Sequence, residues 1–237
     1  MPVMNGEISM QKTAFTVDYL KTRYNFTEKL EVENNNVYFD NVRVFDQKGN
    51  SAYLTGVIRN KYLKDFLFDL TLRSTDFLCL NTTAGDNSMF YGTAYATGVV
   101  RITGPPKNLA MDISATTGKN TSIKIPLSTT GKVSEYNFIT VVRNDTSSVY
   151  EEESENRYQV NLSGMQINFD LTVTPESEVQ IIFDPKLGDI IRGRGSGNLD
   201  MKINTAGSFL MYGDYVIEEG DYLFTLQNFI NKKFNIE

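Results

Sequence analysis

Apolar and polar residues alternate with a period of two along much of the chain. Between residues 165 and 173, Met165, Ile167, Phe169 and Leu171 fall on one face, with mostly polar residues between them. This pattern predicts β-strands with one solvent-facing and one buried face. The apolar positions of the other runs are Phe66, Phe68, Leu70 and Leu72; Leu109, Met111 and Ile113; Ile123 and Ile125; Val179, Ile181 and Phe183; Leu199, Met201 and Ile203; and Met211 and Tyr215.

Turn-forming sequences rich in Gly, Asn, Asp and Pro separate these runs, for example at residues 48–50, 84–87, 104–106 and 117–120. The short spacings favour antiparallel meanders, because parallel neighbours need long crossover connections. No segment shows an amphipathic helical pattern of useful length. The sequence therefore predicts an all-β fold.

An apolar sheet face must be covered by a second sheet, by closure into a barrel or by an apolar ligand. Two runs, 90–103 and 191–203, carry small residues at successive positions of that face. The glycines concerned are Gly92, Gly98, Gly193, Gly195 and Gly197. Glycine in a strand marks a bend or a close approach, so we predict an elongated, curled antiparallel sheet (a β-taco or half-pipe) with an apolar interior. The alternative is a β-sandwich in which the glycines mark bulges.

We expect residues 1–237 to form a single elongated β domain. The chain stops at Glu237 in a strand-like run, which indicates a fragment of a longer protein. The most polar stretch, residues 143–157, contains several glutamates and is interpreted as a flexible loop between two groups of strands.

The net negative charge of the chain limits the classes of partner that we expect it to bind. The formal net charge is -6 and the pI is about 4.9. Nucleic-acid binding depends on cations that replace phosphate counterions, so no nucleic-acid partner is predicted. Attraction to an anionic membrane surface is disfavoured for the same reason, and contact with lipid would have to use apolar surface.

The residues that usually carry catalysis are scarce. The chain contains no His, the commonest general base and metal ligand. Cys79 lies in an apolar run and is interpreted as a small buried hydrophobe. The glycines of residues 193–197 resemble a phosphate-binding loop, but a strand pattern follows where a helix is required. We predict a protein without enzymatic activity, cofactor or metal.

An ordered succession of short motifs resembles the C-terminal domain of TamB proteins, from about Thr13 to the end of the chain. The C-terminal part is carried by residues 179–184 (VQIIFD), 193–199 (GRGSGNL) and 211–226 (MYGDYVIEEGDYLFTL). The upstream motifs, in the same order as in that family, are residues 15–20, 54–58, 77–81, 90–92, 98–106 and 125–127. One departure from the family pattern is at residues 58–60, where many relatives carry a His.

The resemblance implies a periplasmic location and a role between two membranes. TamB proteins are similar to AsmA-like bridge proteins, with an inner-membrane anchor and a long curled sheet that spans the periplasm. They work with a TamA- or BamA-like outer-membrane barrel protein, and are linked to phospholipid transport and to outer-membrane protein assembly. The full-length protein is therefore expected to be anchored in the inner membrane.

Two functional hypotheses follow. In the first, an apolar trough holds phospholipid acyl chains, and its lining is predicted to be Phe66, Phe68, Leu70, Met111, Ile113, Met165, Ile167, Phe169, Leu171, Ile181, Met201, Ile203 and Met211. In the second, the sheet is a scaffold or chaperone whose edge strands, predicted at 179–183 and 224–236, pair with strands of outer-membrane proteins without carrying lipid.

Overall fold

The computed structural model describes residues 3–61, 64–127, 165–184, 188–204, 208–226 and 230–236. Within these ranges the chain forms thirteen β-strands and no helix, which confirms the all-β prediction. The strands are β1 (Gly6–Val17), β2 (Thr22–Glu33), β3 (Asn36–Phe45), β4 (Ser51–Lys61), β5 (Asp65–Thr82), β6 (Tyr91–Gly104), β7 (Ala110–Thr117), β8 (Ser122–Pro126), β9 (Gln166–Val173), β10 (Glu178–Asp184), β11 (Asp189–Asn204), β12 (Ser208–Leu226) and β13 (Ile230–Ile236).

Local sequence explains several of the strand ends. Asn34 and Asn35 both have positive φ angles, as a type I′ turn in the two-residue hairpin between β2 and β3 requires. The turn between β3 and β4 is organised by Asp46, whose carboxylate accepts hydrogen bonds from the backbone N–H groups of Lys48 (2.7 Å) and Asn50 (2.9 Å). The predicted loop at residues 143–157 lies outside the described residues.

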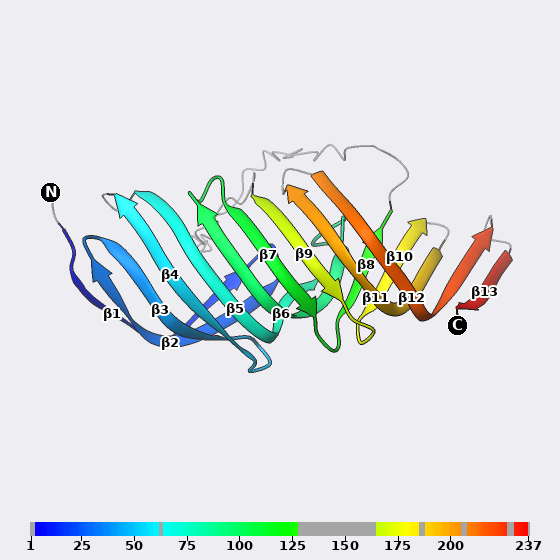
Figure 1. The fold of residues 1–237 in the computed structure, drawn as a ribbon, viewed down its shortest axis with the longest axis horizontal. Coiled ribbons are helices and arrows are strands. Elements are labelled where there is room, and N and C mark those ends of the chain that lie inside the picture. The colour runs from blue at the N-terminus through cyan, green and yellow to red at the C-terminus, as the bar shows by residue number, and fades with distance from the viewer. Residues whose placement is uncertain are drawn as a thin grey trace, which may run out of the picture.

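The strands form one continuous sheet. Figure 1 shows that the molecule is elongated and that the strands run across its long axis. Six of them, β6, β7, β9, β11, β10 and β8, pair in a closed ring. β1 to β5 extend the sheet from β6, and β12 and β13 extend it from β11. In place of an open half-pipe, the strand pairing therefore gives a closed six-strand barrel with extra strands.

The prediction of an antiparallel sheet is correct for most of the strand pairs and wrong for two. β7 pairs in parallel with β9, and β10 pairs in parallel with β8. The prediction considered the short turns between consecutive strands. β7 and β9 are not consecutive, and the long stretch between Pro126 and Gln166 separates β8 from β9 in the sequence. A stretch of that length is long enough for distant strands to align in the same direction.

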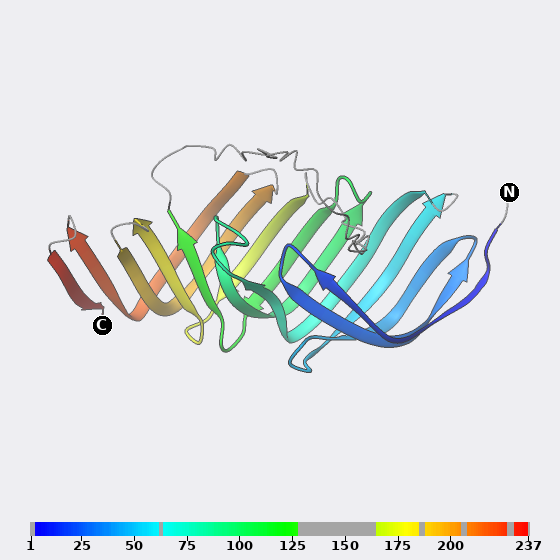
Figure 2. The same cartoon turned by 180° about the vertical axis from the view of Figure 1, so that it is seen from behind.

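The sheet bends along its length into two walls, seen from opposite sides in Figures 1 and 2. One wall contains β7 and β9 and the other contains β8 and β10, and β6 and β11 run through both. At the bend, two turns are joined by hydrogen bonds. The hydroxyl of the buried Ser177 donates to Thr117 Oγ1 (2.6 Å), and the N–H of Thr174 donates to the same atom (2.9 Å).

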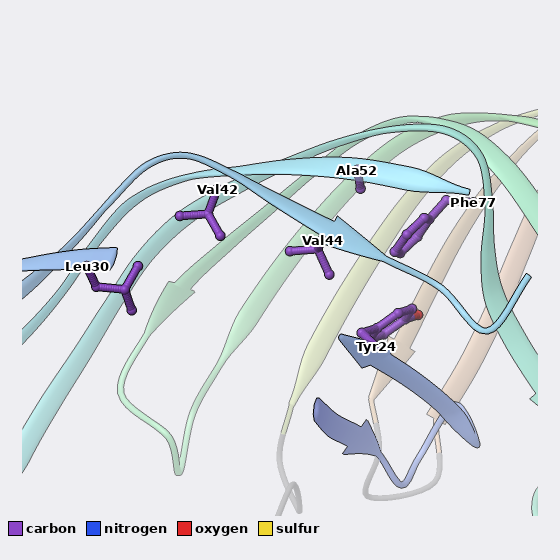
Figure 3. Packing of buried hydrophobic residues seen from close by; sticks show 6 residues of the cluster. All are labelled: Tyr24, Leu30, Val42, Val44, Ala52 and Phe77. Atoms are coloured by element: carbon purple, nitrogen blue, oxygen red, sulfur yellow. The ribbon is translucent and has the colours of Figure 1, made fainter. Parts of the chain in front are cut away.

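The largest core cluster lies at the N-terminal end, between the β1–β2 hairpin and β3 to β5. Tyr24 stacks on Phe77 with ring centroids 4.9 Å apart. Partly buried residues of neighbouring strands, Leu54 and Leu72 among them, pack against this cluster. Its buried members, shown in Figure 3, are Tyr24, Leu30, Val42, Val44, Ala52 and Phe77.

Candidate functional site

An apolar row crosses eight strands of the sheet. Residues that are directly opposite in a β-ladder project from the same face, and the register aligns one such series from β3 to β12. This face is called the inner face below, and the opposite one the outer face. The row consists of Val42, Leu54, Leu72, Val100, Ile113, Phe169, Met201 and Met211.

The predicted trough residues lie on this inner face. A second row, beside the first, joins Leu70, Met111, Ile167 and Ile203 through Ile102. Phe66 and Phe68 continue the same face of β5, and Leu171 continues that of β9. Met165 immediately precedes β9 and is buried.

Ile181 belongs to the other wall. It lies on β10, opposite Ile125 of β8 and Ile191 of β11. The structure therefore places most of the predicted residues on the wall of β7 and β9, with Ile181 on the wall of β8 and β10. Whether they bind lipid stays a prediction.

The predicted curling glycines lie on β6 and β11, the two strands of the ring that run through both walls. A Cβ atom at Gly195 would collide with the carbonyl oxygen of Val216, and one at Gly197 with that of Asp214. Gly98 would meet the backbone of Ser114 and Ala115 in the same way. Gly193 and Gly92 are also crowded, and Gly92 has a φ of +137°, which side chains disfavour.

Cover over the inner face is uneven along the molecule. At the N-terminal end the β1–β2 hairpin buries it in the core cluster described above. In the middle, Tyr19, Met89 and Phe90 pack against a second cluster built on Ile167 and Ile203. Towards the C-terminal end the face becomes more exposed, and Met211 is 37% exposed.

An aromatic group at the C-terminal end was missed by the sequence analysis. The Tyr222 ring lies 6.5 Å from Phe183, 6.2 Å from Phe224 and 6.2 Å from Phe234, between centroids. Phe183 and Phe234 are exposed. Pairing with Ile191 places Tyr222 on the inner face.

A β-bulge explains why alternation did not reveal this group. Gly195 pairs with Ile217 while Arg194 pairs with Glu219, so one extra residue is inserted in β12. Strict alternation from Met211 would have placed Tyr222 on the outer face. The sequence signal for this group is the spacing of Tyr222 and Phe224, which lie two residues apart after Gly220 and therefore on one face of a strand.

The outer face carries a hollow of about 760 Å³ that the sequence did not predict. Its polar lining comes from residues that alternate with the inner rows. Asn168 donates a hydrogen bond to Asp112 (2.8 Å), while Asp170 lies directly opposite Asp200. The charged residues at this hollow are Arg73, Arg101, Asp112, Asp170, Asp200 and Lys202.

Two titratable side chains, Cys79 and Asp46, have pKa values that are shifted by their surroundings in the fold. Burial raises the pKa of the Cys79 thiol to about 12, and its Sγ lies 3.3 Å from the carbonyl oxygen of Ala94. Burial would raise the pKa of Asp46, but hydrogen bonds from Leu78 N–H, Asn50 and the backbone of Lys48 outweigh it and hold the pKa below its ordinary value. In the part of the chain that the structure describes, no three His, Cys, Asp or Glu side chains are grouped to hold a metal ion.

One of the two predicted edge strands is not an edge. Residues 179–183 belong to β10, which pairs with β8 on one side and β11 on the other. Within the second predicted segment, 224–236, β13 pairs with β12 alone among the described strands.

Comparison with known protein families bears on this arrangement. Residues 40–237 match the family model for the TamB C-terminal domain. The chain belongs to the TamB family. The match confirms the resemblance seen in the sequence, apart from its opening motif at residues 15–20, which lies outside the matched range. No curated protein and no solved structure is similar enough to count as a match.

Membership of the TamB family links the domain to assembly and transport at the outer membrane, in general cooperation with the assembly machinery, and to the cell envelope. Within its described residues, this TamB domain has no helix that is long and apolar enough to cross a membrane.

Proposed function

We propose that the inner face of this TamB domain holds the acyl chains of phospholipids on their way to the outer membrane. In this proposal acyl chains lie against the inner face, between the wall of β7 and β9 and the wall of β8 and β10. The domain is the periplasmic part of a bridge protein anchored in the inner membrane. It meets a TamA- or BamA-like barrel protein at the outer membrane and supports the assembly of outer-membrane proteins.

The supporting observation is the uninterrupted apolar row from Val42 to Met211. Apolar contact is non-directional, so a row of aliphatic and aromatic side chains solvates acyl chains of any identity. Ile113, Phe169 and Met201 are only partly buried by the protein itself. Their remaining apolar surface is available to a ligand.

The protein's charge supports contact through acyl chains rather than head groups. The net charge of -6 repels anionic lipid head groups. The apolar inner face instead contacts the hydrocarbon chains, while the polar outer face contacts water.

The test is native mass spectrometry with lipid extraction on protein purified without detergent. We expect phospholipid to co-purify with the wild-type protein and to be lost from a Met211→Asp variant, because a buried unpaired charge is costly. Leu210→Asp is the matched control, since Leu210 neighbours Met211 on β12, is exposed, and projects from the outer face. Leu210→Asp should retain lipid.

The choice of variant matters because some inner-face residues are core residues. Ile167 is 4% exposed, so a charge there would unfold the second cluster. Phe169 is half-buried, and Phe169→Arg provides a second test further along the row. A lipid-free wild-type protein, or equal lipid content in Met211→Asp and Leu210→Asp, would contradict the proposal.

A further inference from the structure

The two walls of the sheet end at different strands. β13 pairs with β12 only along residues 220–226, where β12 belongs to the wall of β8 and β10. Residues 208–219 of β12, called the β12 edge, pair with β11 on one side. No strand in the described ranges pairs with their other side. The wall of β8 and β10 therefore extends one strand further than the wall of β7 and β9.

Because of this step, no described strand of the shorter wall extends opposite the C-terminal aromatic group. Tyr222 and its neighbours lie on the inner face of the longer wall, and Phe234 is 44% exposed. In Figure 1, β13 and the adjoining part of β12 project beyond the rest of the sheet. A strand added to the β12 edge would extend the shorter wall and bring its inward side chains over these rings.

The β12 edge contains one bulge and three acidic residues, but it lacks the Lys and Pro residues that protect many sheet edges from pairing. Natural edges are protected by Lys, Pro or covering segments, and residues 208–219 contain no Lys, Arg or Pro. On the outer face, Leu210, Tyr212 and Val216 are exposed, and Val216 is 63% exposed.

The charges of this edge have a single sign. Its ionisable acids are Asp214, Glu218 and Glu219. Glu218 already accepts a hydrogen bond from Ser196 (2.8 Å), whereas Asp214 projects from the outer face and is exposed. A strand with basic residues on its outward side complements this edge, and a strand with acidic residues is repelled.

We propose that the β12 edge accepts an extended β-strand from a partner protein. The strand adds to the sheet through backbone hydrogen bonds, places apolar residues over Tyr222 and Phe234, and places basic residues beside Asp214. This is recognition by strand addition, in which the backbone supplies affinity and alternate side chains supply selectivity. Strand binding does not require acyl chains, so the proposal stands independently of lipid carriage.

The experiment uses delipidated protein and a fluorescent peptide of about twelve residues with alternating Val and Lys, long enough to span the edge at about 3.4 Å per residue. The control peptide has the same charge but carries Pro in place of its two central Val residues, which prevents ladder formation. We expect the first peptide to bind and to slow amide hydrogen exchange in residues 208–219. The second should not.

Protein variants separate the two faces of the proposed contact. Phe234→Ala should weaken peptide binding roughly tenfold through lost apolar contact. Phe15→Ala is the matched control, because Phe15 has the same 44% exposure but lies on β1 at the other end of the sheet. Asp214→Lys should weaken binding about two- to fivefold, as expected for one exposed charge pair.

Disulfide capture then tests the position of the bound strand. Cys79 is a suitable background residue because burial raises the pKa of its thiol to about 12 and keeps it unreactive. A Val216→Cys protein should cross-link to a peptide cysteine at one position of the strand and not at its neighbours.

Three outcomes would overturn the proposal. Equal binding of the Pro-containing peptide would mean that charge alone attracts the peptide. Slow exchange, in the free monomer, of those N–H groups of residues 208–219 that point away from β11 would mean that the edge is already paired. A concentration-dependent dimer that the peptide dissociates would identify a second copy of this chain as the occupant, in place of a partner protein.

Discussion

The strands at the two ends of this sheet share the same apolar alternation, but the inner face is buried at the N-terminal end and exposed at the C-terminal end. At the N-terminal end the β1–β2 hairpin folds over β3 to β5, and Phe77 is only 2% exposed. At the C-terminal end no hairpin among the described strands covers the inner face, and Phe234 is 44% exposed. Alternation therefore establishes which face is apolar, whereas the presence of a covering hairpin decides whether that face becomes core or stays exposed.

The largest expected effect comes from removing the core aromatic of the covered end. Phe77→Ala should lower the free energy of unfolding by about 3–5 kcal/mol, because a buried ring leaves a cavity. Phe234→Ala at the open end should cost less than about 1 kcal/mol. Urea denaturation of both variants measures the contrast. Equal losses would mean that the C-terminal ring is also part of a core.

The next largest effect is expected at Asp46, whose carboxylate links the turn between β3 and β4 to β5 at the covered end. Asp46 is buried and accepts hydrogen bonds from Leu78 N–H (2.8 Å) and from the side-chain amide of Asn50 (2.9 Å). Asp46→Ala leaves these donors unpaired and should cost about 3 kcal/mol in urea denaturation. The exposed Asp214 is the control, and Asp214→Ala should change stability by less than about 0.5 kcal/mol.

The same residue predicts a pH dependence. The folded-state pKa of Asp46 is lowered, so its contribution to stability is present above the unfolded pKa of about 3.9 and is lost as pH falls through the folded value. Wild-type protein should therefore lose stability on acidification more steeply than Asp46→Asn. Parallel pH profiles would show that the carboxylate does not stabilise the fold through its charge.

A smaller effect is expected where β11 crosses between the walls. Gly195→Ala forces a Cβ against the backbone of Val216 and should cost about 1–3 kcal/mol. Gly85→Ala is the control, since a Cβ there lies 3.8 Å from Thr83 Oγ1 and meets nothing closer. Thermal denaturation of the pair measures whether close approach at the bend limits the choice of residue. A neutral Gly195→Ala would remove the proposed role of this glycine in curling the sheet.

The smallest effect concerns the bend itself. Ser177→Ala removes the buried hydroxyl that donates to Thr117, which should cost about 1 kcal/mol. Ser9→Ala on the exposed face of β1 should be neutral. If Ser177→Ala were neutral as well, the bend would be held by the strand ladders alone.

Much of the strand content could be predicted from the sequence, because alternation is a local property. Met111, Ile167 and Ile203 were assigned to one face, and the register places them opposite one another. The positions of Gly195 and Gly197 were informative too, since a missing Cβ records a close neighbour that sequence alone does not identify.

The pairing of distant strands could not be predicted in this way. Alternation does not specify which strand lies beside which, so the parallel pairs and the closed ring were missed. Bulges also limited the prediction, since one inserted residue in β12 moves every later side chain of that strand to the opposite face. For that reason Tyr222 and the step between the walls emerged only from the register.

The direction of the strands relative to the long axis has a mechanical consequence. The strands cross the long axis, so the hydrogen bonds between them lie closer to that axis than the strands do. Tension applied end to end would pull each ladder apart bond by bond instead of sliding one strand past another. The six-strand ring changes this locally, because a pull from β6 to β11 is shared between the pairs β7–β9 and β8–β10. Under tension the flanking strands should peel away first, leaving the ring as the last folded part.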